Sequence, residues 1–436
     1  MSDFKIFIGN IISPISDHYA NYFPDSCLLA KRQANSNEYL ISEIFESRHL
    51  RQKTKSLNNY EIHDFTGKLI SPTFCDIHFH WVQDEVREMK KDDLLEWLKN
   101  HTWPAEALFE SEEYTFKKAK SFAQSLLKSG TLSGAVYGSI HDHSVELAFD
   151  SFPGDFIVGN VLMTMNSPAS LLQSKQDALS SVSKLGNKYK SRYAITPRFA
   201  ITTHPDVMEA SSKIAQDHDC FIQTHLCETK QEIEFVLDLY SKIPGFEKVK
   251  TYTEIYEKCG ILGPKSILGH GIYLTNDELK MLKDSSSSIA HCPSSNAPVA
   301  QKGLGSGLFD IDLINKHDIS WALASDIGAG PYLSMIDVMN SFISQHRTVG
   351  RKNVSWTMAL YRSTLAGEKI CDNHLQRGNF EVGKQANLIV IDSGKINKSW
   401  DAEVVLRHCF EISYSNRSQV DEKIQSVFWN GNLLTT

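Results

Sequence analysis

An alternation of short apolar runs with longer amphipathic stretches begins near residue 71 and constrains the fold more than any other feature. Eight runs have the length and composition of buried strands: TFCDIHFH, LSGAVYGSI, FIVGNVLM, YAITPRFAI, CFIQTHL, SILGHGIY, SSIAHCP and ISWALASD. Helix-like stretches such as residues 111–130, 204–219 and 228–243 lie between them. Strands that alternate with helices of this length predict βα units and a parallel sheet.

Eight such units over roughly 300 residues match a closed (β/α)8 TIM-type barrel in number and size, so we predict an α/β barrel domain at residues 71–372. A doubly wound open sheet is the alternative, but no Gly-x-Gly-x-x-Gly loop follows any of the runs. Residues 1–70 and 373–436 contain alternating runs such as FKIFIGNIIS and GKQANLIVIDSG. We expect small antiparallel strands from both chain ends to pair into one small flanking β-domain.

Charge and composition exclude several classes of protein. The 45 basic and 52 acidic residues give a net charge of −7, which disfavours a nucleic-acid partner. No apolar run approaches the length of a membrane span, and the start MSDFKIFIGNII lacks the features of a signal peptide. The eight cysteines are scattered with no Cys-x-x-Cys pair, so we expect reduced thiols and no cysteine-bound zinc. We therefore predict a soluble, cytoplasmic protein without a membrane partner.

The carboxyl ends of the predicted strands carry side chains that can bind a metal. His78 and His80 end the first run and, one residue apart on a strand, point to the same side. The fifth run ends in His225, the sixth in His270 and the eighth in Asp326. These ends meet at one mouth of a parallel barrel. Imidazoles with a carboxylate suit zinc or iron and leave a position open for water, so the pattern predicts a metal site.

A second histidine pair, His141 and His143, repeats the one-apart spacing after the second run. We expect no metal there, because no third or fourth ligand presents itself. A two-metal site commonly needs a bridging carboxylate, often a modified lysine on the fourth strand. The fourth run contains TPRF, with Arg198 and no lysine. We therefore predict one metal ion per chain.

The motifs DIHFH, THLCE, GHGIY and SDIGAG, in this order and spacing, resemble the amidohydrolase superfamily. LLEWLKNHTWPAE at 94–106, Gln83, PRF at 197–199 and SIAHCPSSN at 288–296 resemble, more narrowly, the guanine deaminase family. The resemblance covers most of residues 65–392. It implies a homodimeric enzyme that hydrolyses a small-molecule purine, guanine, to xanthine and ammonia.

The resemblance also implies roles for individual residues. One Zn²⁺, or Fe²⁺ in its place, would be bound by His78, His80, His225 and Asp326. Protons and the activated water would be handled by Glu228, His270 and Asp326. The purine would be held by Gln83, Arg198 and Phe199.

Some features leave alternatives open. Trp81 and Val82 are bulky where the family usually has small residues, and Asn387 replaces the family's usual aspartate outside the barrel. Another amidohydrolase activity, such as an aminopurine or pterin deaminase or a chlorohydrolase-like enzyme, is one alternative function. A barrel scaffold without catalysis is another. Glu228 also fits a carboxylate in the first turn of a helix, and Arg198 fits a surface residue.

Overall fold

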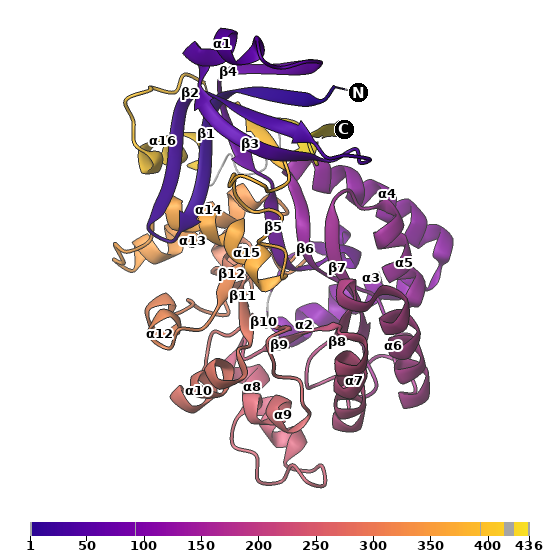
Figure 1. Cartoon of the computed structure of the whole chain (residues 1–436). Coiled ribbons are helices and arrows are strands. Elements are labelled where there is room, and N and C mark those ends of the chain that lie inside the picture. Colours follow the sequence, from indigo (N-terminus) through magenta and orange to yellow (C-terminus); the bar gives the residue numbers. More distant parts are fainter. Residues whose placement is uncertain (1, 92, 393, 414–422, 435–436) are drawn as a thin grey trace. The chain divides into compact units, whose positions relative to one another are not determined.

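The computed structural model describes residues 2–91, 93–392, 394–413 and 423–434 (Figure 1). The chain divides into two compact units. One comprises Met1–Asp76, Gln124–Ser133 and Ser334–Thr436, and the other comprises Ile77–Ala123 and Gly134–Leu333. The predicted domain boundaries near residues 70 and 372 stay a prediction.

No helix in the described residues has both the length and the hydropathy to cross a membrane. All eight cysteines are described, and each is buried and free of a disulfide bond.

The eight predicted strands form one eight-stranded sheet in sequence order, which confirms the predicted barrel. Its strands are β5 (Phe74–His80), β6 (Thr131–Gly138), β7 (Asp155–Leu162), β8 (Ala194–Pro197), β9 (Phe221–Leu226), β10 (Ser266–His270), β11 (Ser288–His291) and β12 (Trp321–Leu323). Neighbours from β7 to β12 pair in parallel. The segment after β12 bonds to β5: the His80 amide donates to the Ile327 carbonyl at 2.5 Å, and the Asp326 amide to the His78 carbonyl at 2.9 Å.

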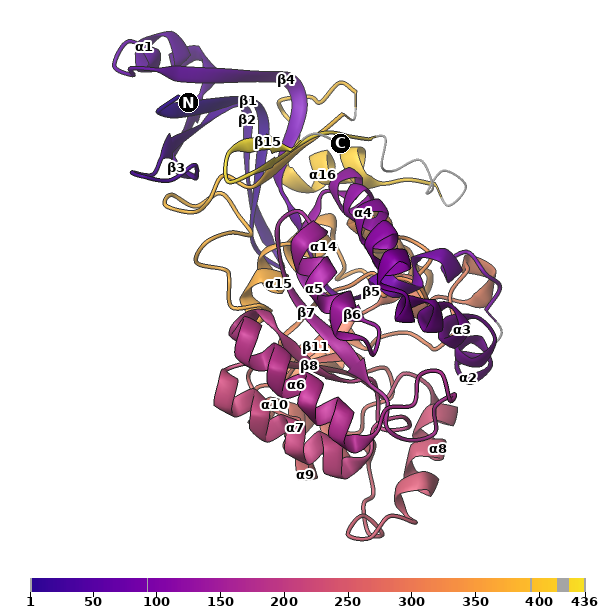
Figure 2. The same cartoon turned by 90° about the vertical axis from the view of Figure 1, so that its right-hand side faces the viewer.

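Helices connect the strands, and α6 and α7 lie side by side next to β8 (Figure 2). The longer helices are α4 (Glu112–Ser129), α5 (Asp142–Ser151), α6 (Lys175–Tyr189), α7 (Pro205–His218), α8 (Lys230–Tyr240), α10 (Asn276–Ser285), α13 (Met335–Thr348) and α16 (Ala402–Phe410). The shorter helices are α1 (Leu50–Thr54), α2 (Leu94–Trp97), α3 (Trp103–Ala107), α9 (Tyr252–Lys258), α11 (Pro293–Asn296), α12 (Ile311–Lys316), α14 (Trp356–Arg362) and α15 (Leu365–Ile370).

Strand β5 is buried on both faces, as in other parallel sheets that helices cover. On one face Phe79 packs against Phe122 of α4, with ring centroids 5.9 Å apart. On the opposite face His78 and His80 pack against Tyr137 of β6, at 4.5 and 4.4 Å. The alternation of side chains along the strand therefore places both imidazoles on the same face.

Two of the predicted strands are shorter than expected. β8 ends at Pro197, which has no amide hydrogen to continue the ladder, so Arg198 lies just beyond the strand. β12 ends at Leu323, and Asp326 lies three residues further on, in a left-handed conformation with φ +50°. Both side chains therefore come from the loops that follow the strands.

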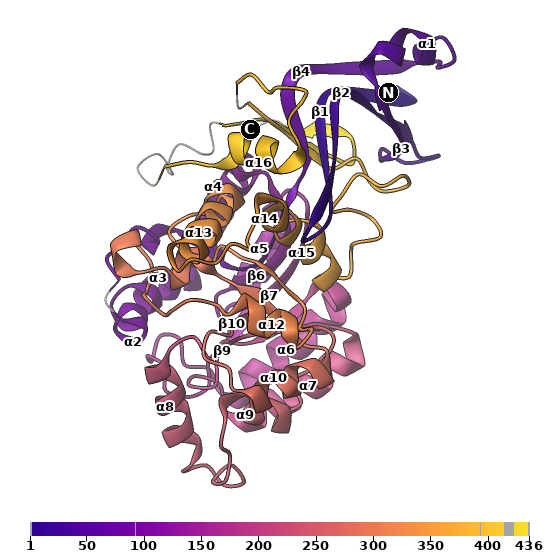
Figure 3. The same cartoon turned by 90° about the vertical axis from the view of Figure 1, so that its left-hand side faces the viewer.

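Strands from both chain ends form a separate mixed sheet in the order β15-β14-β13-β4-β1-β2-β3, as predicted. Figure 3 labels the four strands from the N-terminal part of the chain, β1 to β4. They are β1 (Phe4–Ser16), β2 (Tyr19–Arg32), β3 (Tyr39–Glu46), β4 (Tyr60–Pro72), β13 (Leu388–Ile391), β14 (Ile424–Trp429) and β15 (Asn432–Leu434). β13 pairs antiparallel with β4, which joins the two ends of the chain. The β1–β4 pair is parallel, not antiparallel as expected, because a long crossover through β3 and α1 precedes β4.

Gly159 on β7 tests the close packing of the barrel. A Cβ atom at this position would lie 2.0 Å from the Ala194 carbonyl oxygen and 2.1 Å from the Thr196 Oγ1. Gly159→Ala must push β7 and β8 apart, so we expect its free energy of unfolding to fall by about 1–3 kcal/mol in urea denaturation. Gly263→Ala is the control, because the nearest atom to its added Cβ is Ser266 Oγ at 3.8 Å. Equal stability of the two variants would contradict this packing argument.

Candidate active site

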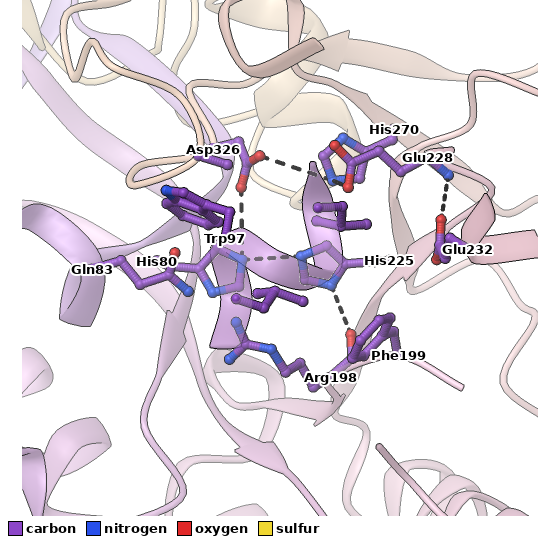
Figure 4. Close-up of a pocket in the computed structure, with 13 residues that line it drawn as sticks. His80, Gln83, Trp97, Arg198, Phe199, His225, Glu228, Glu232, His270 and Asp326 are labelled. Atoms are coloured by element: carbon purple, nitrogen blue, oxygen red, sulfur yellow. Dashed lines mark hydrogen bonds and ion pairs between the residues drawn. The ribbon is translucent and has the colours of Figure 1, made fainter. Parts of the chain in front are cut away.

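Three imidazoles and one carboxylate converge at the carboxyl ends of the barrel strands. Figure 4 shows three of these four side chains, those of His80, His225 and Asp326. One ligand atom from each of four residues lies within 4.8 Å of the others; the residues are His78, His80, His225 and Asp326. The Nε2 atoms of His80 and His225 are 3.1 Å apart. The His78 Nε2 lies 3.4 Å from the Asp326 Oδ1. We refer to these four residues as the ligand cluster.

The chemistry of the ligand cluster fits a divalent cation. Burial lowers the pKa of His78, His80 and His225 well below the usual value, so each imidazole is neutral and offers a lone pair. The His225 Nδ1 bonds to the Arg198 carbonyl at 2.7 Å, which leaves its Nε2 for the cluster. Three neutral imidazoles with one carboxylate are a ligand set that zinc and iron both accept.

The backbone around the ligand cluster is tightly constrained. His270 and Asp326 both have left-handed backbone conformations, with φ +72° and +50°. Residues other than glycine rarely adopt such conformations. Gly269, directly before His270, leaves room for an imidazole: a Cβ there would lie 2.7 Å from the His78 Cε1. A second possible metal set shares two members with the cluster and adds His270 and Cys292.

The pair His141 and His143 lies outside both sets. The two rings stack at 5.4 Å, and the His143 Nε2 lies 2.6 Å from the Phe109 carbonyl oxygen. Within the described ranges, no other group of three or more metal-binding side chains lies close enough together to hold an ion.

Glu228 lies beside the ligand cluster and is fully enclosed. Its Oε2 is 3.6 Å from the His270 Nε2, and its Oε1 accepts hydrogen bonds from Ser306 at 2.8 Å and Asn296 at 3.3 Å. Burial, and secondarily the charge of Asp326, raise the pKa of Glu228 to about 8. The carboxyl group therefore holds a proton near neutral pH and can donate it.

Glu232 supports Glu228 and was not foreseen from the sequence. Its Oε2 accepts the amide hydrogens of Glu228 and Thr229, at 2.8 and 3.2 Å. Thr229 is the N-cap of α8 and forms a capping box with Glu232, so the carboxylate at the helix start is Glu232 and not Glu228. The Thr-x-x-Glu spacing in TKQE was the signal that could have identified it. Burial raises the pKa of Glu232 to about 8 as well.

A pocket opens onto the ligand cluster, and His80, His225 and Asp326 of the cluster line it. Gln83, Arg198 and Phe199, the three predicted substrate contacts, all line it. Arg198 is 2% exposed and is therefore not a surface residue. An apolar wall that was not predicted, although the LLEWL segment contains it, comes from Leu94, Trp97 and Leu98.

Arg198 is paired with a carboxylate behind the pocket. Its Nη1 donates to both oxygens of Glu106, each at 2.7 Å, and Glu106 is completely buried. The Gln83 Nε2 donates to the same carboxylate at 2.7 Å. Glu106 is not a pocket-lining residue. Its role was not predicted, although an acidic side chain in the otherwise apolar TWPAEALF segment was a signal of a buried partner.

Trp81, which is bulky where the family usually has a small residue, packs in the core and not in the pocket. Its ring packs edge-on against Phe109 at 5.1 Å and Phe152 at 5.5 Å, and lies 6.4 Å from Phe122. Neither Trp81 nor Val82 lines the pocket. The bulky side chains after β5 therefore belong to the core.

Known proteins resemble this chain along most of its length. The model of the Amidohydrolase family matches residues 69–434. Guanine deaminase of Escherichia coli (strain K12) is 33% identical over 339 residues, covering 76% of this chain and 74% of that protein. The corresponding protein of Homo sapiens is 32% identical over 337 residues, covering 74% and 72%.

Solved structures of guanine deaminases are similar to this chain over nearly its whole length. The structure of E. coli guanine deaminase matches with a TM-score of 0.84 and 28% identity over 99% of both chains. Guanine deaminase from C. acetobutylicum, solved with bound guanine in the active site, matches with a TM-score of 0.82 and 25% identity, over 99% of this chain and 100% of that one. The chain thus belongs to the amidohydrolase family and, within it, to the guanine deaminase family.

Proposed function

We propose that this protein hydrolyses guanine to xanthine and ammonia. One observation carries the proposal: a single pocket combines three members of the ligand cluster with Glu228, whose pKa burial raises to about 8, and with the hydrogen-bonding groups of Arg198 and Gln83. Relatives named guanine deaminase, one of them solved with guanine in its active site, support it. A homodimeric assembly and a cytoplasmic location remain expectations from the family resemblance.

We infer that the ligand cluster holds one divalent ion, zinc by preference and ferrous iron as the alternative. Such an ion lowers the pKa of a coordinated water from about 15.7 to roughly 7, so that a nucleophile is available at neutral pH. Asp326 also has a second oxygen, Oδ2, which lies 3.9 Å from the His270 Nε2. Asp326 can therefore accept a proton from the attacking water, while His270 orients the attacking oxygen.

Glu228 is the group proposed to move protons on the purine. Attack of water at C2 forms a carbon–oxygen bond and pushes electrons onto a ring nitrogen, which Glu228 can protonate. Cleavage of the C2–N bond then needs a second proton on the departing amino group. The water loses two protons in all: one ends on the departing amino group, and the other, accepted by Asp326, restores the proton of Glu228. A carboxyl group with a pKa of about 8 can carry out both transfers near neutral pH.

The purine slot is proposed to recognise the carbonyl edge of guanine. Arg198 carries only hydrogen-bond donors, which suit the carbonyl oxygen at the six position. Gln83 can donate and accept at the same edge. Phe199, at 4% exposure, can pack against the face of the ring.

The metal assignment predicts the composition of the purified protein. Wild-type protein should contain about one equivalent of zinc or iron per chain, because one cluster offers four ligands. His225→Ala should lose most of this metal, measured by inductively coupled plasma mass spectrometry. His141→Ala, from the pair outside the cluster, should keep it. Full metal content and activity in His225→Ala would refute the assignment of His225.

The proton-transfer assignment predicts a defect in turnover alone. Glu228→Gln keeps the size of the side chain but cannot cycle a proton, so kcat should fall by roughly 100-fold or more while metal content stays unchanged. Glu278→Gln is the control, since Glu278 is also a buried glutamate but belongs to the capping box of α10 and does not line the pocket. Normal turnover by Glu228→Gln would show that another group moves the proton.

The substrate assignment predicts a strong preference for guanine. Adenine has an amino group where guanine has a carbonyl, so it would leave the Arg198 donors unpaired. We expect kcat/KM for guanine to exceed that for adenine by at least roughly tenfold. A higher kcat/KM for adenine or a pterin would overturn the assignment of guanine and leave only the deaminase chemistry.

Variants of Arg198 test the same assignment from the side of the enzyme. Arg198→Ala leaves the Glu106 carboxylate buried without its cation, which is destabilising in itself. Arg198→Lys retains the charge but not the planar fork of donors. Both variants should lose most guanine activity and keep the metal. Wild-type kcat/KM in Arg198→Lys would contradict the proposed contact with the carbonyl.

A further inference from the structure

We propose that Glu106 is a positioning residue that sets the charge preference of the purine slot. By neutralising Arg198, it makes the slot accept an uncharged ring that bears a carbonyl group, and release a product that is partly an anion. This inference rests on the proposed hydrolysis of guanine, and it assigns a role to a residue that does not line the pocket.

The Arg198–Glu106 pair is a strong local interaction. The side chains are 3% and 0% exposed, and both carboxylate oxygens lie 2.7 Å from one guanidinium nitrogen. Water cannot screen charges at this depth, so the carboxylate cancels most of the arginine's field at the pocket. The slot therefore presents the donors of an arginine without a net positive charge.

Glu106 balances the positive charge of Arg198 but accepts hydrogen bonds from only one of its guanidinium nitrogens. Only the Nη1 atom bonds to the carboxylate. Within the part of the chain that the structure describes, the remaining guanidinium nitrogens have no hydrogen-bonding acceptor from the protein. Since Arg198 lines the pocket, these nitrogens are available to a carbonyl oxygen of the substrate.

The same carboxylate fixes the orientation of Gln83. A carboxylate can only accept, so the Gln83 amide nitrogen must face Glu106, to which it donates at 2.7 Å. The Gln83 Oε1 then lies on the other side, where the Gly328 amide is 3.4 Å away. Glu106 therefore determines which atoms of Gln83 the purine meets. Three separate segments contribute: Gln83 follows β5, Glu106 lies on α3 and Arg198 follows β8.

Substrate and product differ in acidity, so a slot without net positive charge favours release of the product. Hydrolysis replaces the amino group of guanine with a carbonyl group, and xanthine loses a ring proton more readily than guanine does. Near neutral pH the substrate is uncharged, while part of the product is an anion. An unpaired arginine would attract this anion and slow its release.

The test is Glu106→Gln, which keeps the shape of the side chain and removes its charge. Binding of xanthine to the zinc-loaded protein is measured by calorimetry below and above the ring pKa of xanthine. We expect the ratio of the affinity above this pKa to that below it to rise at least roughly tenfold over wild type. We also expect kcat/KM for guanine to fall. Glu106→Asp, which keeps the charge, should retain the wild-type ratio.

The ratio isolates the effect of Glu106 from the other charged groups. The titratable groups that face the pocket are the same in every variant: His80, His225, His270, Glu228, Glu232 and Asp326. Glu368→Gln is the matched control, because Glu368 pairs with Arg377 in the other unit at 3.0 Å, with exposures of 1% and 4%. This control should leave the xanthine ratio unchanged. An unchanged ratio in Glu106→Gln would overturn the inference.

Wild-type protein provides a second test that does not depend on the folding of a variant. Its affinity for xanthine should be lower above the ring pKa than below it, and tighter binding of the anion would overturn the inference. Guanine turnover by the wild type reports on the proposed function separately. Turnover together with an unchanged xanthine ratio in Glu106→Gln refutes only the role of Glu106, whereas absence of turnover refutes the proposed function.

Discussion

Two backbone hydrogen bonds between β5 and the segment after β12 hold the candidate site together. The Asp326 amide donates to the His78 carbonyl, and the His80 amide donates to the Ile327 carbonyl. These bonds link the first and last strands of the barrel sheet and align the ligands that the two ends supply. Closure of the barrel and assembly of the ligand cluster are therefore one event, and a change that opens this seam would separate the ligands.

The site manages buried charge in two ways. Burial drives Glu228 and Glu232 toward their protonated forms and the cluster imidazoles toward their neutral forms, because a low-dielectric interior disfavours charge. Arg198 cannot lose its proton in this way, and it is instead paired with Glu106. The groups proposed to move protons are thus those that burial can neutralise, and the group proposed to bind a carbonyl is held permanently charged beside a counter-ion.

The parts of the structure that follow strand periodicity were predictable. His78, His80, His225 and His270 end apolar runs, and parallel topology alone brings such ends together. Glu106 was not predicted, because only the packing of segments distant in sequence brings it next to Arg198. Glu232 was missed although its Thr-x-x-Glu spacing is a local signal of a capping box. The parallel direction of the β1–β4 pair was also missed, because alternation predicts a strand but not the direction of its neighbour. Asp326 was predicted as a site residue although β12 ends before it.

Gly269 and His78 occupy adjoining space, with 2.7 Å between the His78 Cε1 and the position where a Cβ would lie. A larger residue at 269 and an imidazole at 78 therefore exclude each other. In evolutionary terms, the two positions are epistatic. A lineage that first enlarges residue 269 displaces the imidazole, and one that first replaces His78 loses a member of the ligand cluster. Both single-step routes pass through an impaired protein, so descendants that keep this cluster inherit the glycine with it.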